Sequence, residues 1–265
     1  MSHILPDLAT LIGIVKAAAM AELLPRITRS HQHFKGDGSI VTEADHAMQQ
    51  ILQTALQLRW PHIAFLGEEM PAPQQEQILC DSPRGVWIVD PLDGTSNFSL
   101  GIPCFAVSVA LILKGQIELG LVYDPARDEC FAAQRGQGAR LNETVLDLAA
   151  LRDNDTMTIG LVDFKRLAPA LASKLAITPP YKSQRSFGSV ALDWCWIAAG
   201  RGDVSVHGQQ KLWDYAAGHL ILSEAGGIAA TLQGEPVFNG MLAPRSAVLA
   251  INQTLFDTWL RYLQT

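Results

Sequence analysis

The stretch VWIVDPLDGTSNF, residues 86 to 98, carries two aspartates at the end of an apolar run and separates them by a proline and a leucine. Residues 86–89 are apolar and rich in β-branched side chains, which is typical of a strand buried on both faces. Asp90 then lies at the carboxyl end of that strand, where open α/β sheets usually bind ligands. Pro91 fixes one backbone dihedral, so the two carboxylates lose little entropy when they bind an ion.

The same stretch has a second interpretation as an ordinary β-turn. Asp, Pro and Gly are common turn residues, and Pro91 suits the first central position of a turn. The functional interpretation is a metal site at Asp90 and Asp93. In that interpretation Gly94 permits close backbone approach, and Thr95 opens a short helix whose free N–H groups suit a phosphate. The rest of the chain decides between the two.

The composition narrows the class of protein. The chain has 265 residues, 48% hydrophobic and 17% charged, which is enough for one large domain or two modest ones with a substantial core. The net charge is −6 and there is no basic run, so direct binding of nucleic acid is not expected. The four cysteines form no C-x-x-C pair, which favours reduced thiols in a cytosolic protein over a disulfide framework or a zinc site.

The N-terminal third predicts two helices and a short strand. Residues 6–27 predict an amphipathic helix and not a signal peptide, because the segment lacks a basic start. No apolar run reaches the roughly 18 to 20 residues that a membrane span needs. Residues 42–60 have helical spacing, and IAFLGEEM predicts a strand that ends in Glu68 and Glu69. Residues 71–85 are expected to form a loop with one helical turn at most.

The remainder of the chain predicts a meander followed by an α/β pattern. Residues 105–142 contain three extended runs separated by turn residues, which indicates antiparallel strands. Near residue 150 the chain is loop-like, a soft boundary between an α+β half, about 1–150, and an α/β half, about 151–265. Residues 213–227, WDYAAGHLILSEAGG, predict a helix with Asp214 at its N-terminal end and a glycine stop.

Acidic residues gather at the ends of these predicted elements: Glu68, Glu69, Asp90, Asp93, Asp214, and Asp45 one helical turn after Thr42. Taken singly, each has a structural explanation as a solvated turn, a helix-dipole partner or a capping box. Taken together they suit magnesium, which binds carboxylates, waters and phosphate oxygens. Two such ions about 3.5–4 Å apart would stabilise the attacking and the leaving oxygen of an in-line phosphoryl displacement.

GEE, DPLDGTSNFSLGIP and WDYAAGHLILSEAGG, in this order and spacing, resemble the inositol monophosphatase family of metal-dependent, lithium-sensitive phosphatases. The resemblance covers nearly the whole chain, from the KGDGSIVTEAD loop to the C-terminal helix. It implies a layered αβαβα sugar-phosphatase fold, α+β or α/β in class, within one domain of residues 1–265. It also implies a cytoplasmic homodimer with two or three Mg²⁺ ions, for which Mn²⁺ is a substitute and Ca²⁺ and Li⁺ are inhibitors.

The resemblance implies a role for individual residues. The first metal would be held by Glu68, Asp90 and the Leu92 carbonyl, and the second by Asp90, Asp93 and Asp214. Glu68 would also share a third, weaker ion, and Glu69 would support the site. Gly94 and Thr95 would donate backbone N–H groups to the phosphate, and the Thr95 hydroxyl with Asp45 would orient the attacking water. Further positions near the substrate or on the loop beside the site are Lys35, Thr42 and Ser186.

The expected reaction is hydrolysis of a small phosphate monoester without a phosphoenzyme, and the substrate stays open. Inositol 1-phosphate or a related sugar or polyol phosphate is the first choice. The alternatives are 3′(2′),5′-bisphosphate nucleotidase, fructose-1,6-bisphosphatase or histidinol-phosphatase activity. A role of another class, binding of the transcription machinery, also stays open, because some relatives of this family do so.

His207 is where the sequence departs from that family. Typical members have a glutamate seven residues before the aspartate of the WD pair, and this glutamate contacts inositol hydroxyls; here the position is His207. A neutral histidine accepts at most one hydrogen bond, and it becomes a cation near pH 6.5, its approximate unperturbed pKa. With Arg185 and Lys211 nearby, a ligand with a second anionic group is expected to be preferred. The plainer alternative is that His207 is a surface turn residue.

Overall fold

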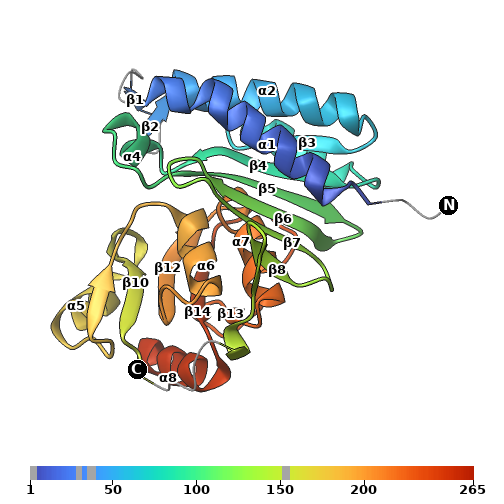
Figure 1. Ribbon diagram of the computed structural model, residues 1–265. Helices are drawn as coiled ribbons and strands as arrows, with labels where there is room; N and C mark the ends of the chain where they lie inside the picture. The colour runs from blue at the N-terminus through green and yellow to red at the C-terminus, as the bar shows by residue number, and fades with distance from the viewer. Residues whose placement is uncertain (1–4, 28–31, 35–39, 151–155) are drawn as a thin grey trace.

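Two β-sheets alternate with three layers of helices in the computed structural model of this protein, which describes residues 5–27, 32–34, 40–150 and 156–265. The layers follow one another as α1 and α2, a seven-stranded sheet, α6 and α7, a five-stranded sheet, and finally α5 with α8 (Figure 1). This arrangement confirms the layered αβαβα fold that the sequence predicts.

The first layer consists of α1 (Leu8–Glu22) and α2 (Glu43–Arg59), which pack on each other and on the seven-stranded sheet. Both helices match the predicted segments. The prediction that no stretch is long enough for a membrane span was wrong: Leu8–Arg26, α1 with the turn η1 (Leu24–Arg26), passes on length, 19 residues, and composition. A core helix passes the same test, and α1 buries Leu11 and Val15 against its neighbours, so this is weak evidence for a membrane.

The seven-stranded sheet contains the predicted strand and meander. β3 and β4 run parallel, and every later neighbour pairs antiparallel. Its strands are β3 (Ala64–Gly67), β4 (Val86–Asp93), β5 (Ala106–Leu113), β6 (Gln116–Asp124), β7 (Glu129–Gln134), β8 (Ala139–Leu141) and β9 (Thr144–Leu146). A separate pair, β1 (Gln32–Phe34) and β2 (Ile40–Thr42), precedes α2.

The segment between β3 and β4 corrects the expected loop. It forms α3 (Ala72–Cys80), a nine-residue helix that begins directly after Pro71. The buried amide of Gln75 donates to the carbonyls of Gly67, at 2.9 Å, and Glu68, at 3.1 Å. This contact fixes α3 to the end of β3. The helix was not predicted because the sequence of α3 is too polar to show a helical pattern by itself.

The second half builds the five-stranded sheet and the remaining helices. In the order β11-β10-β12-β14-β13, the first three strands are parallel and the last two pair antiparallel. The strands are β10 (Ile159–Asp163), β11 (Ser183–Arg185), β12 (Val204–Gln210), β13 (Ile228–Ala230) and β14 (Arg245–Ala250). The helices are α5 (Pro169–Ile177), α6 (Val190–Ala198), α7 (Leu212–Glu224) and α8 (Gln253–Gln264), with short 3-10 turns η2 (Leu148–Ala150) and η3 (Phe164–Arg166).

The larger hydrophobic core joins the two halves of the chain. It contains side chains from both sheets and from α6 and α7 between them, while a smaller core lies under α1 and α2. The four cysteines are free thiols, as expected. Because α7 packs on β4, β5 and β6, its N-terminus is fixed beside the end of β4, where the acidic residues lie.

Candidate active site

A cleft of about 400 Å³ opens where β4 ends, between the seven-stranded sheet and the second half of the chain. Its walls come from the ends of β3, β4, β10 and β12 and from the first turns of α4 (Thr95–Ser99), α6 and α7. Nine of the residues that the sequence puts at the site line this cleft: Glu68, Asp90, Leu92, Asp93, Gly94, Thr95, Ser186, His207 and Asp214. Asp45 does not line it but accepts a hydrogen bond from the Thr95 hydroxyl.

Three carboxylates meet at the floor of the cleft. Glu68 follows β3, Asp90 lies in β4, and Asp214 lies in the first turn of α7. Each offers an oxygen, and these three oxygens lie within 4.8 Å of one another. Among the residues that the structure describes, this is the group whose geometry suits a bound cation.

Burial makes the charge of this cluster costly. The pKa of Asp214 is raised to about 8 by burial first and then by the charges of Glu68 and Asp93. The pKa of Asp90 is raised well above its usual range by burial and by its acidic neighbours. The pKa of Asp93 is raised to about 6, mainly by burial. A divalent cation among these oxygens would offset both the burial and the repulsion, and an all-oxygen donor set fits Mg²⁺.

The Asp90–Asp93 segment is a bulged strand, so the β-turn interpretation was wrong. Asp90 pairs with Ser108 of β5, Asp93 pairs with Ala106, and the register shifts between the two pairs. The backbone N–H of Leu92 donates to Asp90 Oδ1 at 3.0 Å. A bulge re-aims side chains without ending the strand, and here both carboxylates line the cleft.

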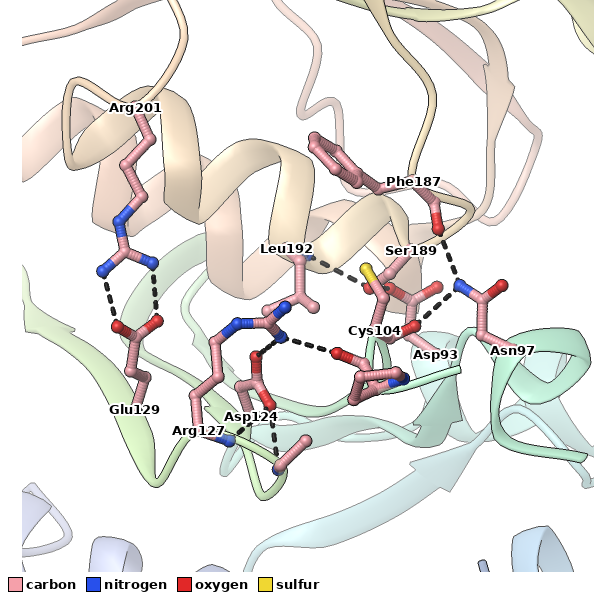
Figure 2. A network of polar contacts seen from close by, with 12 residues as sticks. Asp93, Asn97, Cys104, Asp124, Arg127, Glu129, Phe187, Ser189, Leu192 and Arg201 are labelled. Carbon is pink, nitrogen blue, oxygen red and sulfur yellow. Dashed lines mark hydrogen bonds and ion pairs between the residues drawn. The ribbon is translucent and has the colours of Figure 1, made fainter. Parts of the chain in front are cut away.

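Asp93 also connects the two halves of the chain at the start of α6. Its Oδ2 accepts from the Ser189 hydroxyl at 2.5 Å and from the Ala191 N–H at 2.8 Å. Figure 2 shows Asp93 beside Ser189. Beside it, the Asn97 amide of α4 donates to the Phe187 carbonyl at 2.6 Å (Figure 2). The carboxylate is therefore held in place by one oxygen, which leaves the other for the cleft.

Gly94 and Thr95 form a tight entry to α4. Gly94 has φ +89°, and a Cβ there would lie 2.9 Å from the Cys104 carbonyl oxygen, so only glycine fits without strain. The Thr95 hydroxyl lies 2.9 Å from Asp45 Oδ1 and 3.0 Å from the Leu92 carbonyl. The first turn of α4 directs its free N–H groups at the same cleft.

Asp45 both caps α2 and contacts Thr95 at the site. Its Oδ2 accepts from the backbone N–H and the hydroxyl of Thr42, each at 2.7 Å, which makes the capping box. Its Oδ1 remains for Thr95. Burial raises the pKa of Asp45, although the hydrogen bonds from Thr42 and Thr95 act to lower it. Glu69 is not among the lining residues, and its N–H donates to Gln49 at 2.9 Å; Lys35 lies outside the described residues.

The cleft is also lined by three residues that the sequence analysis did not identify, Asp163, Lys165 and Arg166, beside the expected His207. His207 is 5% exposed and lies within β12, so the surface-turn alternative was wrong. It pairs with Asp163 of β10, and Lys165 and Arg166 follow on η3. The expected cations Arg185 and Lys211 do not line the cleft. The available signal was DFKR directly after the strand TIGLV, because parallel strand ends gather at ligand sites.

The sequence profile of the Inositol monophosphatase family matches residues 6–264, and the chain belongs to this family. Two relatives are Nus factor SuhB of Pasteurella multocida, 38% identical over 76% of this chain and 74% of that protein, and an inositol-1-monophosphatase of Mesorhizobium japonicum, 39% identical over 76% and 75%.

A solved structure gives the same result for the fold. SaIMPase-II, crystallised with inositol monophosphate and with 2′AMP, is 26% identical, with TM-scores of 0.79 and 0.78. In both cases the match covers 97% of this chain and 93% of that chain. The family and fold implied by the sequence resemblance are confirmed.

Proposed function

We propose that this chain is an Mg²⁺-dependent phosphomonoesterase that uses water to hydrolyse a small phosphorylated metabolite. The observation that carries the proposal is the group of half-buried Glu68 with buried Asp90 and Asp214, which lies in one cleft with the first turn of α4. Carboxylates alone would repel an anionic substrate, whereas carboxylates that hold divalent cations attract it. The adjacent helix N-terminus suits a phosphate.

The proposed metal ligands are Glu68, Asp90 and the Leu92 carbonyl for one ion, and Asp90, Asp93 and Asp214 for the other. For Asp93 the free oxygen is Oδ1, since Oδ2 is bonded to Ser189 and Ala191. When bound, the ions neutralise charge that develops on the phosphate and on the leaving oxygen. Mn²⁺ as a substitute and inhibition by Ca²⁺ and Li⁺ belong to the same proposal.

The proposed catalytic pair is Thr95 with Asp45. A hydroxyl has one proton, and when Thr95 donates it to Asp45 Oδ1, at 2.9 Å, the Thr95 oxygen is left as an acceptor. That oxygen then accepts a hydrogen bond from a water in the cleft and orients it toward phosphorus. Asp45 is held by the two bonds from Thr42, so the pair is pre-organised before substrate binds. The proposed phosphate donors are the backbone N–H groups of Gly94 and Thr95.

The proposed substrate class is a phosphate monoester of a small alcohol, such as inositol 1-phosphate or a related sugar or polyol phosphate. Crystals of SaIMPase-II with inositol monophosphate and with 2′AMP support a family site that accommodates different alcohols. The bisphosphate nucleotidase, fructose-1,6-bisphosphatase and histidinol-phosphatase alternatives share the same chemistry, so a substrate panel separates them. We also propose a cytoplasmic homodimer.

A second candidate role is binding to the transcription machinery. It is favoured by one observation, the Nus factor name of a relative 38% identical to this chain. Such a role does not require the carboxylate group. Retention of Glu68, Asp90, Asp93 and Asp214 in one cleft therefore favours catalysis as the first function.

The test is phosphate release from a panel of monoesters and bisphosphates, measured with added Mg²⁺ and again with excess chelator. The proposal predicts release from at least one ester that depends on Mg²⁺. Asp147→Asn, an exposed acid outside the cleft, is the control and should behave like the wild type. No release from any ester at saturating Mg²⁺ would contradict the phosphatase proposal and leave the partner-binding role.

A further inference from the structure

The wall formed by Asp163, Lys165, Arg166 and His207, called here the cationic wall, carries positive charge that the phosphatase chemistry does not use. These residues line the same cleft as the carboxylates. Phosphate attached at the metal centre is accounted for by the ions and by α4. The wall is therefore left for another part of the substrate.

Packing holds the cationic wall rigidly in place. His207 and Asp163 are paired in register on the parallel strands β12 and β10. Behind His207, Gly208 lets the turn after β10 lie directly on β12, because a Cβ at Gly208 would lie 1.7 Å from the Arg166 carbonyl oxygen. Arg166 in turn donates to the Gln209 carbonyl at 3.2 Å. Arg166 is thus fixed against β12, the strand that contains His207.

Both oxygens of the Asp163 carboxylate are bonded within the wall, which contains the two cations Lys165 and Arg166 against this one anion. One oxygen lies 2.7 Å from His207 Nε2, and the other accepts from the Lys165 backbone N–H at 2.9 Å. Burial acts to raise the pKa of Asp163, yet the hydrogen bonds and positive charges around it lower this pKa. The carboxylate therefore remains charged and holds a proton on Nε2 of the imidazole.

His207 Nδ1 is the polar atom left for a ligand. It is buried and has no hydrogen-bond partner among the residues that the structure describes, although buried polar atoms are nearly always paired. The Lys165 ammonium likewise has no partner within the described part of the chain, and it lies on an exposed turn at the mouth of the cleft. An anion in this part of the cleft would accept hydrogen bonds from Lys165 and Arg166, with His207 lining the same wall.

We propose that the cationic wall binds a second anionic group, a phosphate or a carboxylate, on the alcohol part of the substrate. The preferred substrates are then phosphate monoesters of acidic alcohols, and not those of neutral polyols. This inference rests on the phosphatase function proposed above. Lys165, Arg166 and His207 determine specificity, and Asp163 is a positioning residue.

The test compares matched esters with Mg²⁺ present: 3′-AMP against adenosine 3′,5′-bisphosphate, and glycerol 2-phosphate against 2-phosphoglycerate. The first pair adds a second phosphate, and the second pair adds a carboxylate. The wild type should favour the doubly anionic member of at least one pair by about tenfold or more in kcat/KM, the size expected of one charge-assisted contact. A ratio near one in both pairs overturns the inference.

Variants assign the preference to the wall. In Lys165→Gln/Arg166→Gln the ratio should fall toward one, and His207→Gln should lower it by a smaller factor. Arg185→Gln removes an exposed cation that does not line the cleft, so it should keep the wild-type ratio. A preference that persists in the double variant overturns the inference.

Calorimetry of the same ester pairs separates failure of this inference from failure of the phosphatase function. Tighter binding of the doubly anionic ester, lost in Lys165→Gln/Arg166→Gln, supports the wall even if no ester is hydrolysed. Equal binding of both members of each pair by the metal-loaded wild type overturns it, whether or not Mg²⁺-dependent phosphate release is seen.

Discussion

The two walls of the cleft are built in opposite ways. On the carboxylate wall, Asp90 and Asp93 come from one short bulged segment of β4, which also leads directly into Gly94 and Thr95. On the cationic wall, Asp163 and His207 are far apart in sequence and meet only because β10 and β12 pair in parallel. Local sequence places Asp90, Asp93, Gly94 and Thr95 together, and packing then adds Glu68 and Asp214 to them. The cationic wall has no such local segment that joins Asp163 to His207, so it depends on strand pairing.

This difference separates reaction from specificity. The geometry of the carboxylate wall is fixed by β4, by the Leu92 N–H and by the start of α6. A fixed geometry suits the residues that carry out the reaction. The cationic wall is attached by a 3-10 turn and one glycine contact, so its residues can change without disturbing the metal centre. If the two walls are separable, a substitution in one should leave the function of the other intact.

The largest effect is expected for Asp90→Asn. The amide keeps the shape but removes one negative charge from the group with Glu68 and Asp214, so kcat should fall on the order of a thousandfold or more. Steady-state phosphate release at saturating Mg²⁺ measures this. Asp193→Asn is the comparison, because Asp193 lines the same cleft and burial also raises its pKa, but it lies outside the group of three; it should lose far less. Near wild-type turnover in Asp90→Asn would refute the carboxylate wall.

Thr95→Ala should have the next largest effect. The variant removes the hydroxyl 2.9 Å from Asp45 and should lower kcat by about a hundredfold while Mg²⁺ affinity stays near that of the wild type. Thr95→Ser keeps the hydroxyl and should recover most of the activity. The idea fails if alanine and serine give the same rate.

Gly208→Ala tests the packing of the cationic wall. The added methyl group meets the Arg166 carbonyl, so η3 must move, at a cost of about 1–3 kcal/mol of stability. The preference for doubly anionic esters should fall, and Mg²⁺ affinity should not. Gly13→Ala is the control, because nothing lies within 4 Å of its Cβ position on α1, and it should stabilise by about 0.5–1 kcal/mol. A Gly208→Ala protein with unchanged stability and selectivity would show that the wall does not depend on this contact.

The smallest predicted effect is on stability against pH. Folded Asp93 and Asp214 have pKa values raised to about 6 and about 8, above the usual 3.8, so the folded state binds more protons than the unfolded state in between. Their contribution in the metal-free protein is therefore present below about pH 4 and is lost as the pH rises to about 8. Thermal unfolding with chelator should show this fall, and saturating Mg²⁺ should remove it. A metal-free protein that gains stability over this range would contradict the account.

Much of the fold could be predicted because its signals are local. Residues 42–60 show helical periodicity and an N-cap, and the strand before Asp90 is a continuous apolar run. Two errors had tertiary causes. The helix α3 depends on Gln75 binding the end of β3, and the bulge at Asp90–Asp93 depends on pairing with β5, which no turn propensity reports.

In the candidate site, too, only the residues with local sequence signals could be predicted. The carboxylates were recognisable because each stands at an element end in a long motif. The cations were not, because Arg185 and Lys211 lie close to the cleft residues in sequence but do not line it, whereas Lys165 and Arg166 do. Which cations line the cleft is decided by the pairing of β10 with β12 and by the absence of a side chain at Gly208. The hydrophobic pattern of the sequence reveals neither feature.

The most direct measurement of the central claim, that the carboxylate wall is a magnesium centre, is calorimetric titration of Mg²⁺ into the wild type and into Asp90→Asn. The wild type should bind Mg²⁺ and release protons, because carboxylates with raised pKa values must ionise as the ion enters. Asp90→Asn should lose most of the affinity and much of the proton release while it remains folded. Equal affinity and equal proton release in the two proteins would contradict the account.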